Sequence, residues 1–167
     1  METGLSLGSN LGDRQANLVD ARDRILGLPG TRLLAQSPLY ETEPIGVKPE
    51  YQQLDFLNAV LILDTQAEVH KWFDWLRAIE TEMGRLRSLD RYAPRGIDVD
   101  VIYFGSLRIE SGGLFVPHRQ WKKRRFVLQP LADVRPDLML PGETRTVRQV
   151  LDALPPGEAV NLLTRDW

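Results

Sequence analysis

Residues 56–63, Phe-Leu-Asn-Ala-Val-Leu-Ile-Leu, are apolar at every position except Asn58. A strand with one wet face alternates apolar and polar residues, whereas a strand covered on both faces is apolar throughout. This segment therefore predicts a central strand with a packed layer on each side. Because side chains alternate along a strand, Asn58 shares one face with Phe56, Val60 and Ile62.

The remaining hydrophobic pattern predicts helices and strands in irregular alternation. Residues 5–7 are typical of a short strand, and the apolar spacing after Asp13, a good N-cap residue, predicts a helix. Thr65 and Glu68 have the spacing of a capping box, which would begin a second helix. Further strands are expected at residues 31–40, 97–104, 107–110 and 159–163, and a further helix at 146–154.

A strand, a turn and a strand follow one another around Gly105 and Ser106. This step favours an α+β fold, in which helices cover an antiparallel or mixed sheet, over a doubly wound parallel sheet. No linker-like stretch divides the sequence, so residues 1–167 are expected to form a single domain. Residues 41–53, which contain Pro44 and Pro49, predict a long loop that could act as a lid.

Composition narrows the class of protein. With 167 residues, 43% of them hydrophobic, the chain can bury a core, and a net charge of -2 gives no field that attracts nucleic acid or an anionic membrane. The absence of cysteine excludes disulfides and thiolate metal sites. Neither a signal-peptide pattern nor an apolar run of about 20 residues occurs, so a cytoplasmic protein is expected.

Asp98 and Asp100 lie two residues apart in the strand expected at 97–104, so their side chains point to one face and their Cα atoms lie about 6.5 Å apart. Two such carboxylates repel each other, and Mg²⁺ would relieve the repulsion, since it prefers oxygen ligands. A solvated strand face would also accept alternating aspartates, so the pair alone leaves both interpretations open. Ile102 and Phe104, expected on the same face, indicate burial further along.

Arginines surround the acidic pair in the sequence. Arg85, Arg87, Arg91 and Arg95 precede it directly, and a second basic run covers residues 119–125. The guanidinium group presents a rigid fork of donors that suits phosphate oxygens. A single arginine is more simply a solvated surface residue, but two basic segments together with an Asp pair favour a phosphate site.

Three further positions are candidates with simpler alternatives. Glu80, at the edge of a helical apolar face, is suited equally to an ion pair with a nearby arginine or to a nucleotide sugar. His118 is more simply structural, although beside phosphates it could donate a hydrogen bond; it is not expected to act as a base. Phe56 and Asn58 on one strand face could stack on and read a flat polar heterocycle, and core packing is the alternative for Phe56.

Several function classes lack their motifs. No P-loop occurs, because the segment from Gly8 to Gly12 has no lysine, and no dinucleotide-binding glycine motif, nucleophile elbow or zinc-spaced His pair is found. Two rivals remain: another Asp-x-Asp metal-dependent transferase, and an RNA-binding module of ferredoxin-like shape. The second would need an aromatic RNP strand, which residues 124–127 only partly match.

Taken together, the motifs resemble those of the 6-hydroxymethyl-7,8-dihydropterin pyrophosphokinase family. They occur in the family's order from near residue 5 to about residue 137. The matching segments are Gly8 to Asp13, Ser37 to Thr42, Phe56-Leu57-Asn58, Glu80-x-x-x-Gly84-Arg85-x-Arg87, Pro94-Arg95-x-x-Asp98-x-Asp100, and Pro117-His118 with Arg124-x-Phe126-Val127-Leu128-x-Pro130-Leu131. Arg77, Tyr92 and Arg119 depart from the family pattern.

The resemblance implies a three-layer α/β/α fold with a ferredoxin-like core, and a monomer. It implies an enzyme that transfers pyrophosphate from ATP to 6-hydroxymethyl-7,8-dihydropterin and releases AMP, in folate biosynthesis. Its partners would be these small molecules, without nucleic acid or membrane. Two Mg²⁺ ions would be held by Asp98 and Asp100.

The resemblance also assigns roles to single positions of this sequence. The catalytic residues would be Arg85, Arg95, Asp98 and Asp100. ATP would be bound by Arg77, Glu80, Arg87, Arg95, His118 and Arg124. The pterin would be sandwiched by Phe56 and Phe126, read by Asn58, and contacted by backbone groups around Thr42 and Ile45.

Overall fold

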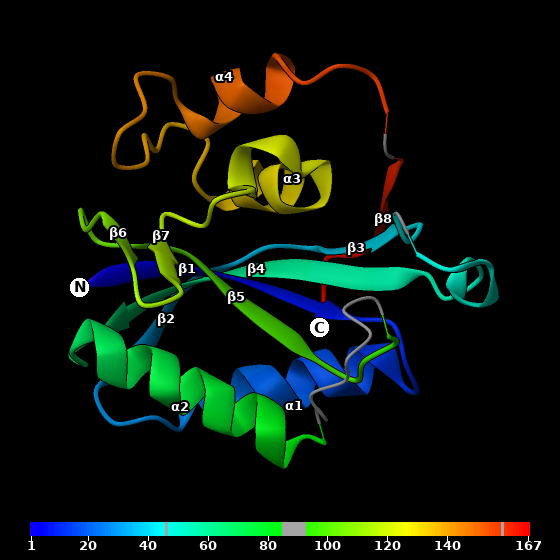
Figure 1. The fold of residues 1–167 in the computed structure, drawn as a ribbon, viewed down its shortest axis with the longest axis horizontal. Coiled ribbons are helices and arrows are strands. Elements are labelled where there is room, and N and C mark those ends of the chain that lie inside the picture. Colours follow the sequence, from blue (N-terminus) through cyan, green and yellow to red (C-terminus); the bar gives the residue numbers. More distant parts are fainter. Residues whose placement is uncertain (46, 85–92, 158) are drawn as a thin grey trace.

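The computed structural model describes residues 1–45, 47–84, 93–157 and 159–167 (Figure 1). Short 3-10 turns lie at Pro49–Tyr51 and Trp121–Lys123. In chain order the elements are β1 (Glu2–Ser9), α1 (Arg14–Leu26), β2 (Thr31–Gln36), β3 (Leu39–Thr42), β4 (Phe56–Thr65), α2 (Val69–Glu82), β5 (Asp98–Phe104), β6 (Ile109–Ser111), β7 (Leu114–Val116), α3 (Arg125–Val134), α4 (Val147–Asp152) and β8 (Val160–Thr164).

The main sheet is antiparallel throughout its pairings. Its strand order is β5-β1-β4-β3-β8, and β2 also pairs with β4. The elements β1-α1-β2-β4-α2-β5 follow the β-α-β-β-α-β order of a ferredoxin-like core, with β1 and β4 at its centre. The expected α+β class and antiparallel sheet are therefore confirmed. Strands β6 and β7 form a separate hairpin.

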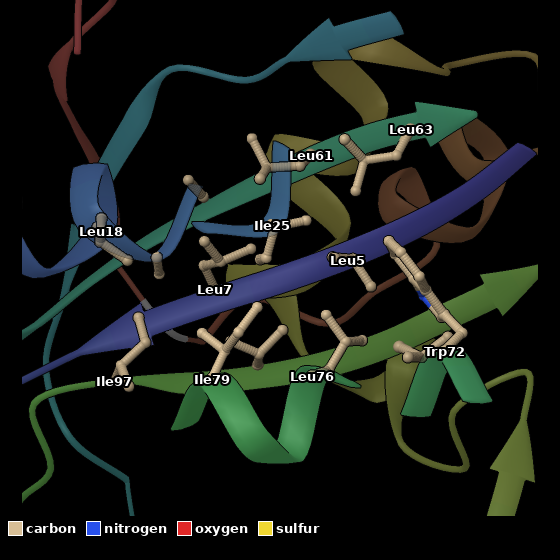
Figure 2. Close-up of a cluster of buried hydrophobic side chains, with 14 of the residues drawn as sticks. Leu5, Leu7, Leu18, Ile25, Leu61, Leu63, Trp72, Leu76, Ile79 and Ile97 are labelled. Atoms are coloured by element: carbon tan, nitrogen blue, oxygen red, sulfur yellow. The ribbon is translucent and has the colours of Figure 1, made fainter. Parts of the chain in front are cut away.

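Helices cover both faces of the sheet, with α1 and α2 on one side and α3 and α4 on the other (Figure 1). On the first side Leu61 and Leu63 of β4 pack with Trp72 and Leu76 of α2 (Figure 2). On the second side Val60 and Ile62 of β4 pack with residues of α3 and α4, including Leu128, Leu131 and Val150. Strand β4 is thus buried on both faces, as its sequence predicts.

Two helix starts test the capping predictions. Asp13 caps α1, and its side chain accepts a hydrogen bond from the Ala16 N–H. The predicted capping box of Thr65 with Glu68 is wrong, because Thr65 is the last residue of β4 and pairs with Thr31. Glu68 itself caps α2 by accepting from the N–H groups of residues 70 and 71.

The face assignment along β5 is half correct. Asp98, Asp100 and Ile102 point toward α3 and α4, where Ile102 is buried. Phe104 is buried on the opposite side, against α1 and α2. The register between β1 and β5 shifts between Gly4 and Leu5, and this irregularity reverses the alternation before Phe104.

Candidate active site

The centre of the site is one row of residues across three neighbouring strands. Gly8 of β1 pairs with Asn58 of β4 on one side and with Asp98 of β5 on the other. All three positions face α3 and α4, because Asn58 shares its face with Val60 and Asp98 shares its face with Ile102. Two strand spacings separate Asn58 from Asp98, which is roughly 10 Å. The row therefore has an amide at one end, a carboxylate at the other and no side chain between.

The carboxylates of Asp98 and Asp100 are partly exposed and lie within a cluster of cationic and imidazole groups. Arg95 Nη1 lies 3.0 Å from Asp98 Oδ2, and Arg124 Nη1 lies 3.7 Å from Asp100 Oδ2. His118 Nε2 lies 3.9 Å from the same oxygen of Asp100. The structure thus brings Arg95, His118 and Arg124 together around the Asp pair of β5.

The pair fits a hard divalent cation. Both side chains supply oxygen donors from adjacent same-face positions of one strand and remain open to solvent on one side. Within the described ranges no set of three or more His, Cys, Asp or Glu side chains could hold a metal. We expect an ion bound at Asp98 and Asp100 to complete its shell with water and substrate oxygens, as Mg²⁺ usually does.

His118 is neutral at pH 7, and its tautomer is fixed by its neighbours. Burial, together with the positive charge of Arg124, lowers the pKa of His118 to about 4. The Gln120 N–H donates to His118 Nδ1 at 3.1 Å, so the ring proton resides on Nε2. That N–H points toward the Asp100 side of the site. The arrangement makes His118 a hydrogen-bond donor.

A pocket of about 290 Å³ lies beside Asp100, between α2, β5 and the β6–β7 hairpin. Arg77, Glu80 and Phe73 line it from α2, and Phe115 lines it from β7. Phe73 and Phe115 have no sequence signal for a site role, because their position at the pocket depends on the placement of the hairpin over α2. A pocket with aromatic walls, a guanidinium and a nearby carboxylate pair can hold a flat base with a phosphate chain.

Glu80 makes a contact that neither sequence interpretation included. Its Oε1 accepts a hydrogen bond from the backbone N–H of Val99 at 2.8 Å, and the side chain is buried. Strand β5 lies at the edge of the sheet, so its outward N–H groups need partners other than a strand. Glu80 therefore holds the peptide between the two aspartates while its side chain also borders the pocket.

The other half of the site lies along β3 and β4. Asn58 Nδ2 donates to Thr42 Oγ1 at 2.7 Å, and both residues are buried. Phe56 is half-buried on the face of Asn58, and Phe126 packs against the α3 and α4 cluster on that same side of the sheet. The aromatic pair and the amide predicted to bind a heterocycle therefore share one side of the sheet.

Some predicted residues are exposed or fall outside the described part of the chain. Ile45 is exposed, with 53% of its surface accessible. Arg85 and Arg87 lie outside the described residues, as do Arg91 and Tyr92.

Thr42 is the last residue of β3, so the loop expected from residue 41 begins after it and contains the turn at Pro49–Tyr51. In the described part of the chain, no helix is both long and apolar enough to cross a bilayer.

Two curated proteins are similar to this chain over most of its length. A *Methylorubrum extorquens* protein named 2-amino-4-hydroxy-6-hydroxymethyldihydropteridine pyrophosphokinase is 40% identical over 152 residues, which are 91% of this chain and 92% of that protein. A *Pseudomonas aeruginosa* protein of the same name is 42% identical over 151 residues, or 90% of each chain.

A solved structure shares the fold. The *Plasmodium falciparum* HPPK-DHPS crystallised with pterin and p-hydroxybenzoate matches with a TM-score of 0.68 at 14% identity. The match covers 90% of this chain and 41% of that longer one. The model of one family, described as 7,8-dihydro-6-hydroxymethylpterin-pyrophosphokinase, matches residues 4–136. The chain belongs to the 7,8-dihydro-6-hydroxymethylpterin-pyrophosphokinase family.

Proposed function

We propose that this protein transfers the pyrophosphoryl group of ATP to the hydroxyl of 6-hydroxymethyl-7,8-dihydropterin, releasing AMP, as a step of folate biosynthesis. The family match and the names of the relatives support the reaction. The observation that carries it is the row Asn58–Gly8–Asp98, which aligns a heterocycle-reading amide and a carboxylate on one face of the sheet. The strands that carry these two groups are separated by two strand spacings, roughly 10 Å.

The two substrates would approach from opposite ends of that row. ATP would place its base in the pocket beside Arg77 and Glu80, with its phosphates directed toward Asp100. The pterin would stack between Phe56 and Phe126, with its polar edge at Asn58 and the adjacent Thr42. The pterin hydroxyl would then attack the β-phosphorus in line, without a covalent enzyme intermediate.

Asp98 and Asp100 would hold magnesium, two ions by family resemblance, which when bound neutralises phosphate charge and polarises the attacking hydroxyl. The guanidinium groups of Arg95 and Arg124 would stabilise charge on the transferring group, since both already border the Asp pair. We assign similar roles to Arg85 and Arg87.

The remaining proposals concern His118 and the whole chain. His118, neutral with its proton on Nε2, would donate a hydrogen bond to a phosphate oxygen. We also propose that residues 1–167 act as one domain, because the two hydrophobic clusters share a single sheet. A monomeric state stays a prediction from the family resemblance, and a cytoplasmic location and the absence of nucleic-acid partners stay predictions from the sequence.

The decisive experiment is to incubate the protein with ATP, Mg²⁺ and 6-hydroxymethyl-7,8-dihydropterin and to separate the nucleotides by chromatography. AMP formed in equal amount to the pterin pyrophosphate supports the proposal. Release of ADP, or of free pyrophosphate with the nucleoside monophosphate attached to the acceptor, would instead indicate a different metal-dependent transferase.

Replacement of the metal-binding carboxylate tests the site within the same assay. We expect Asp98→Ala to lower kcat by several orders of magnitude, roughly 10³-fold or more, while the protein stays folded. Asp152→Asn, which changes an exposed carboxylate at the end of α4, is the matched control and should leave kcat unchanged. A near-normal rate for Asp98→Ala at saturating Mg²⁺ would contradict the assignment.

A further inference from the structure

The turn between β1 and α1 makes contacts that the proposed mechanism does not use. Asn10, directly after β1, has only 3% of its surface exposed. Its backbone N–H donates to the Arg95 carbonyl at 3.2 Å, and its Oδ1 accepts from the Arg95 N–H at 2.8 Å. Two hydrogen bonds thus hold a single residue of the segment before β5.

The residue held in this way reaches the catalytic carboxylate. Arg95 Nη1 lies 3.0 Å from Asp98 Oδ2, so fixing its backbone limits where its guanidinium can lie. Strand β1 is the neighbour of β5 in the sheet, and Gly8 pairs with Asp98. Asn10 therefore fixes the position of Arg95 relative to β1, which lies inside the sheet.

The same turn also contacts the segment that leads into β4. Asn10 Nδ2 donates to the Leu54 carbonyl at 3.5 Å, two residues before Phe56. At the first residue of α1, Arg14 Nη1 donates to the Asp55 carbonyl at 2.8 Å. Arg14 Nη2 also lies 2.7 Å from Glu41 Oε2, next to Thr42. The pterin side of the site is thus tied to the turn by Asn10 and to the start of α1 by two contacts of Arg14.

We propose that the β1–α1 turn couples the two halves of the active site. Asn10 is the positioning residue, and it fixes the location of Arg95 relative to the strands that would bind the pterin. This inference rests on the proposed function. Pyrophosphoryl transfer needs both substrates in line, and a displacement of about 1 Å can reduce the rate about 100-fold. A buried amide that bonds to both segments can fix their separation without contacting either substrate.

The first test replaces the amide. Asn10→Ala should lower kcat about 10- to 100-fold, with the KM values for ATP and pterin changed less than about threefold, because Arg95 acts in the transition state. Asn17→Ala is the matched control. Asn17 Nδ2 donates to Ser9 Oγ and the Leu11 carbonyl, so it supports the same turn without taking part in either Asn10–Arg95 hydrogen bond. Equal losses in both variants would overturn the proposal.

The second test asks whether Asn10 acts through Arg95. We expect Arg95→Ala and the double variant Asn10→Ala/Arg95→Ala to have the same kcat, because the amide has nothing to position once the guanidinium is gone. Losses that multiply in the double variant would mean that Asn10 acts independently, and the proposal would be wrong.

The third test does not depend on activity. Amide hydrogen exchange should become faster in Asn10→Ala both at residues 93–96 and at residues 53–55, and in Asn17→Ala at neither. Faster exchange at only one segment, or at none, would refute the coupling. If the unmodified protein forms no AMP, the proposed reaction fails, and this exchange measurement still decides whether the turn joins the two segments.

Discussion

Gly8 shows how a single residue sets the space in the site. A Cβ atom at this position would lie 3.2 Å from Asn58 Oδ1 and 3.7 Å from Phe56 Cδ1. The strand pairing places Gly8 between Asn58 and Asp98, where any side chain would occupy the gap between them. The need for glycine here comes from the close approach of these groups, since its backbone torsion does not lie in the left-handed region.

Gly8→Ala tests this at the residue scale. The added methyl group forces Asn58 to shift by a few tenths of an ångström and disturbs the amide that would read the pterin edge. We expect the KM for pterin to rise about 5- to 20-fold, equivalent to about one hydrogen bond, with a smaller change in the KM for ATP. Steady-state kinetics with each substrate varied in turn gives both values.

Gly157→Ala is the control for that variant, because among the described residues a Cβ atom there would meet only the Pro155 carbonyl, at 3.9 Å. It should change neither KM. A Gly8→Ala protein with an unaltered KM for pterin would show that the pterin does not lie across β1.

At the scale of elements, α2 supports β5 by two different means. Its apolar face, which includes Trp72, Leu76 and Ile79, packs beneath the sheet (Figure 2). Its Glu80 carboxylate accepts a hydrogen bond from the Val99 N–H on the outer edge of β5. The helix therefore holds the strand that carries Asp98 and Asp100 in two ways, by packing under the sheet and by a hydrogen bond at the outer edge of the strand.

Glu80→Ala should lower the free energy of unfolding by about 1–3 kcal/mol, because the buried Val99 N–H would lose its partner. Glu80→Gln keeps an oxygen that can accept this bond and should lose less. Urea denaturation measures both. Glu82→Ala, on the exposed side of the same helix, is the control, and its ion pair with Arg24 is worth at most about 1 kcal/mol. If Glu80→Ala were no less stable than Glu82→Ala, the edge contact would have no energetic role.

At the scale of the whole molecule, Glu2 joins the first strand to the end of α3. Its carboxylate lies 2.9 Å from Arg135 Nη2 and accepts from the Tyr103 hydroxyl at 2.6 Å. Burial alone would raise the pKa of Glu2, but hydrogen bonds from Arg135 and Tyr103 outweigh it and lower the pKa below its ordinary value of 4.5. The charged form of Glu2 is therefore the one that stabilises the fold.

A lowered folded-state pKa gives stability that is complete above the unfolded pKa and is lost as the pH falls through the folded pKa. Glu2→Gln should therefore lower the Tm at pH 7 and pH 6, and the difference from the unmodified protein should shrink as the pH falls below about 4.5. Melting curves across this range test it. Glu110→Gln, which removes an exposed carboxylate from β6, is the control, and a constant difference for Glu2→Gln would contradict the linkage.

The sequence by itself determined the local features of this protein. The apolar run at residues 56–63 indicated a strand covered on both sides, and the spacing of Asp98 and Asp100 indicated one shared face. The motifs identified the family. Each of these inferences depends on periodicity or on residue types at fixed spacing, which the chain records directly.

Only the tertiary structure decided which segments are neighbours. Periodicity shows which face of a strand is buried, but strand order and register follow from packing between segments far apart in the chain. Thus β1 lies between β4 and β5, and Asn58 and Asp98 lie on opposite sides of Gly8 in one row across the sheet. The register shift before Phe104, the contact of Glu80 with Val99 and the position of Thr65 in β4 were settled in the same way, because each depends on a partner that is remote in sequence.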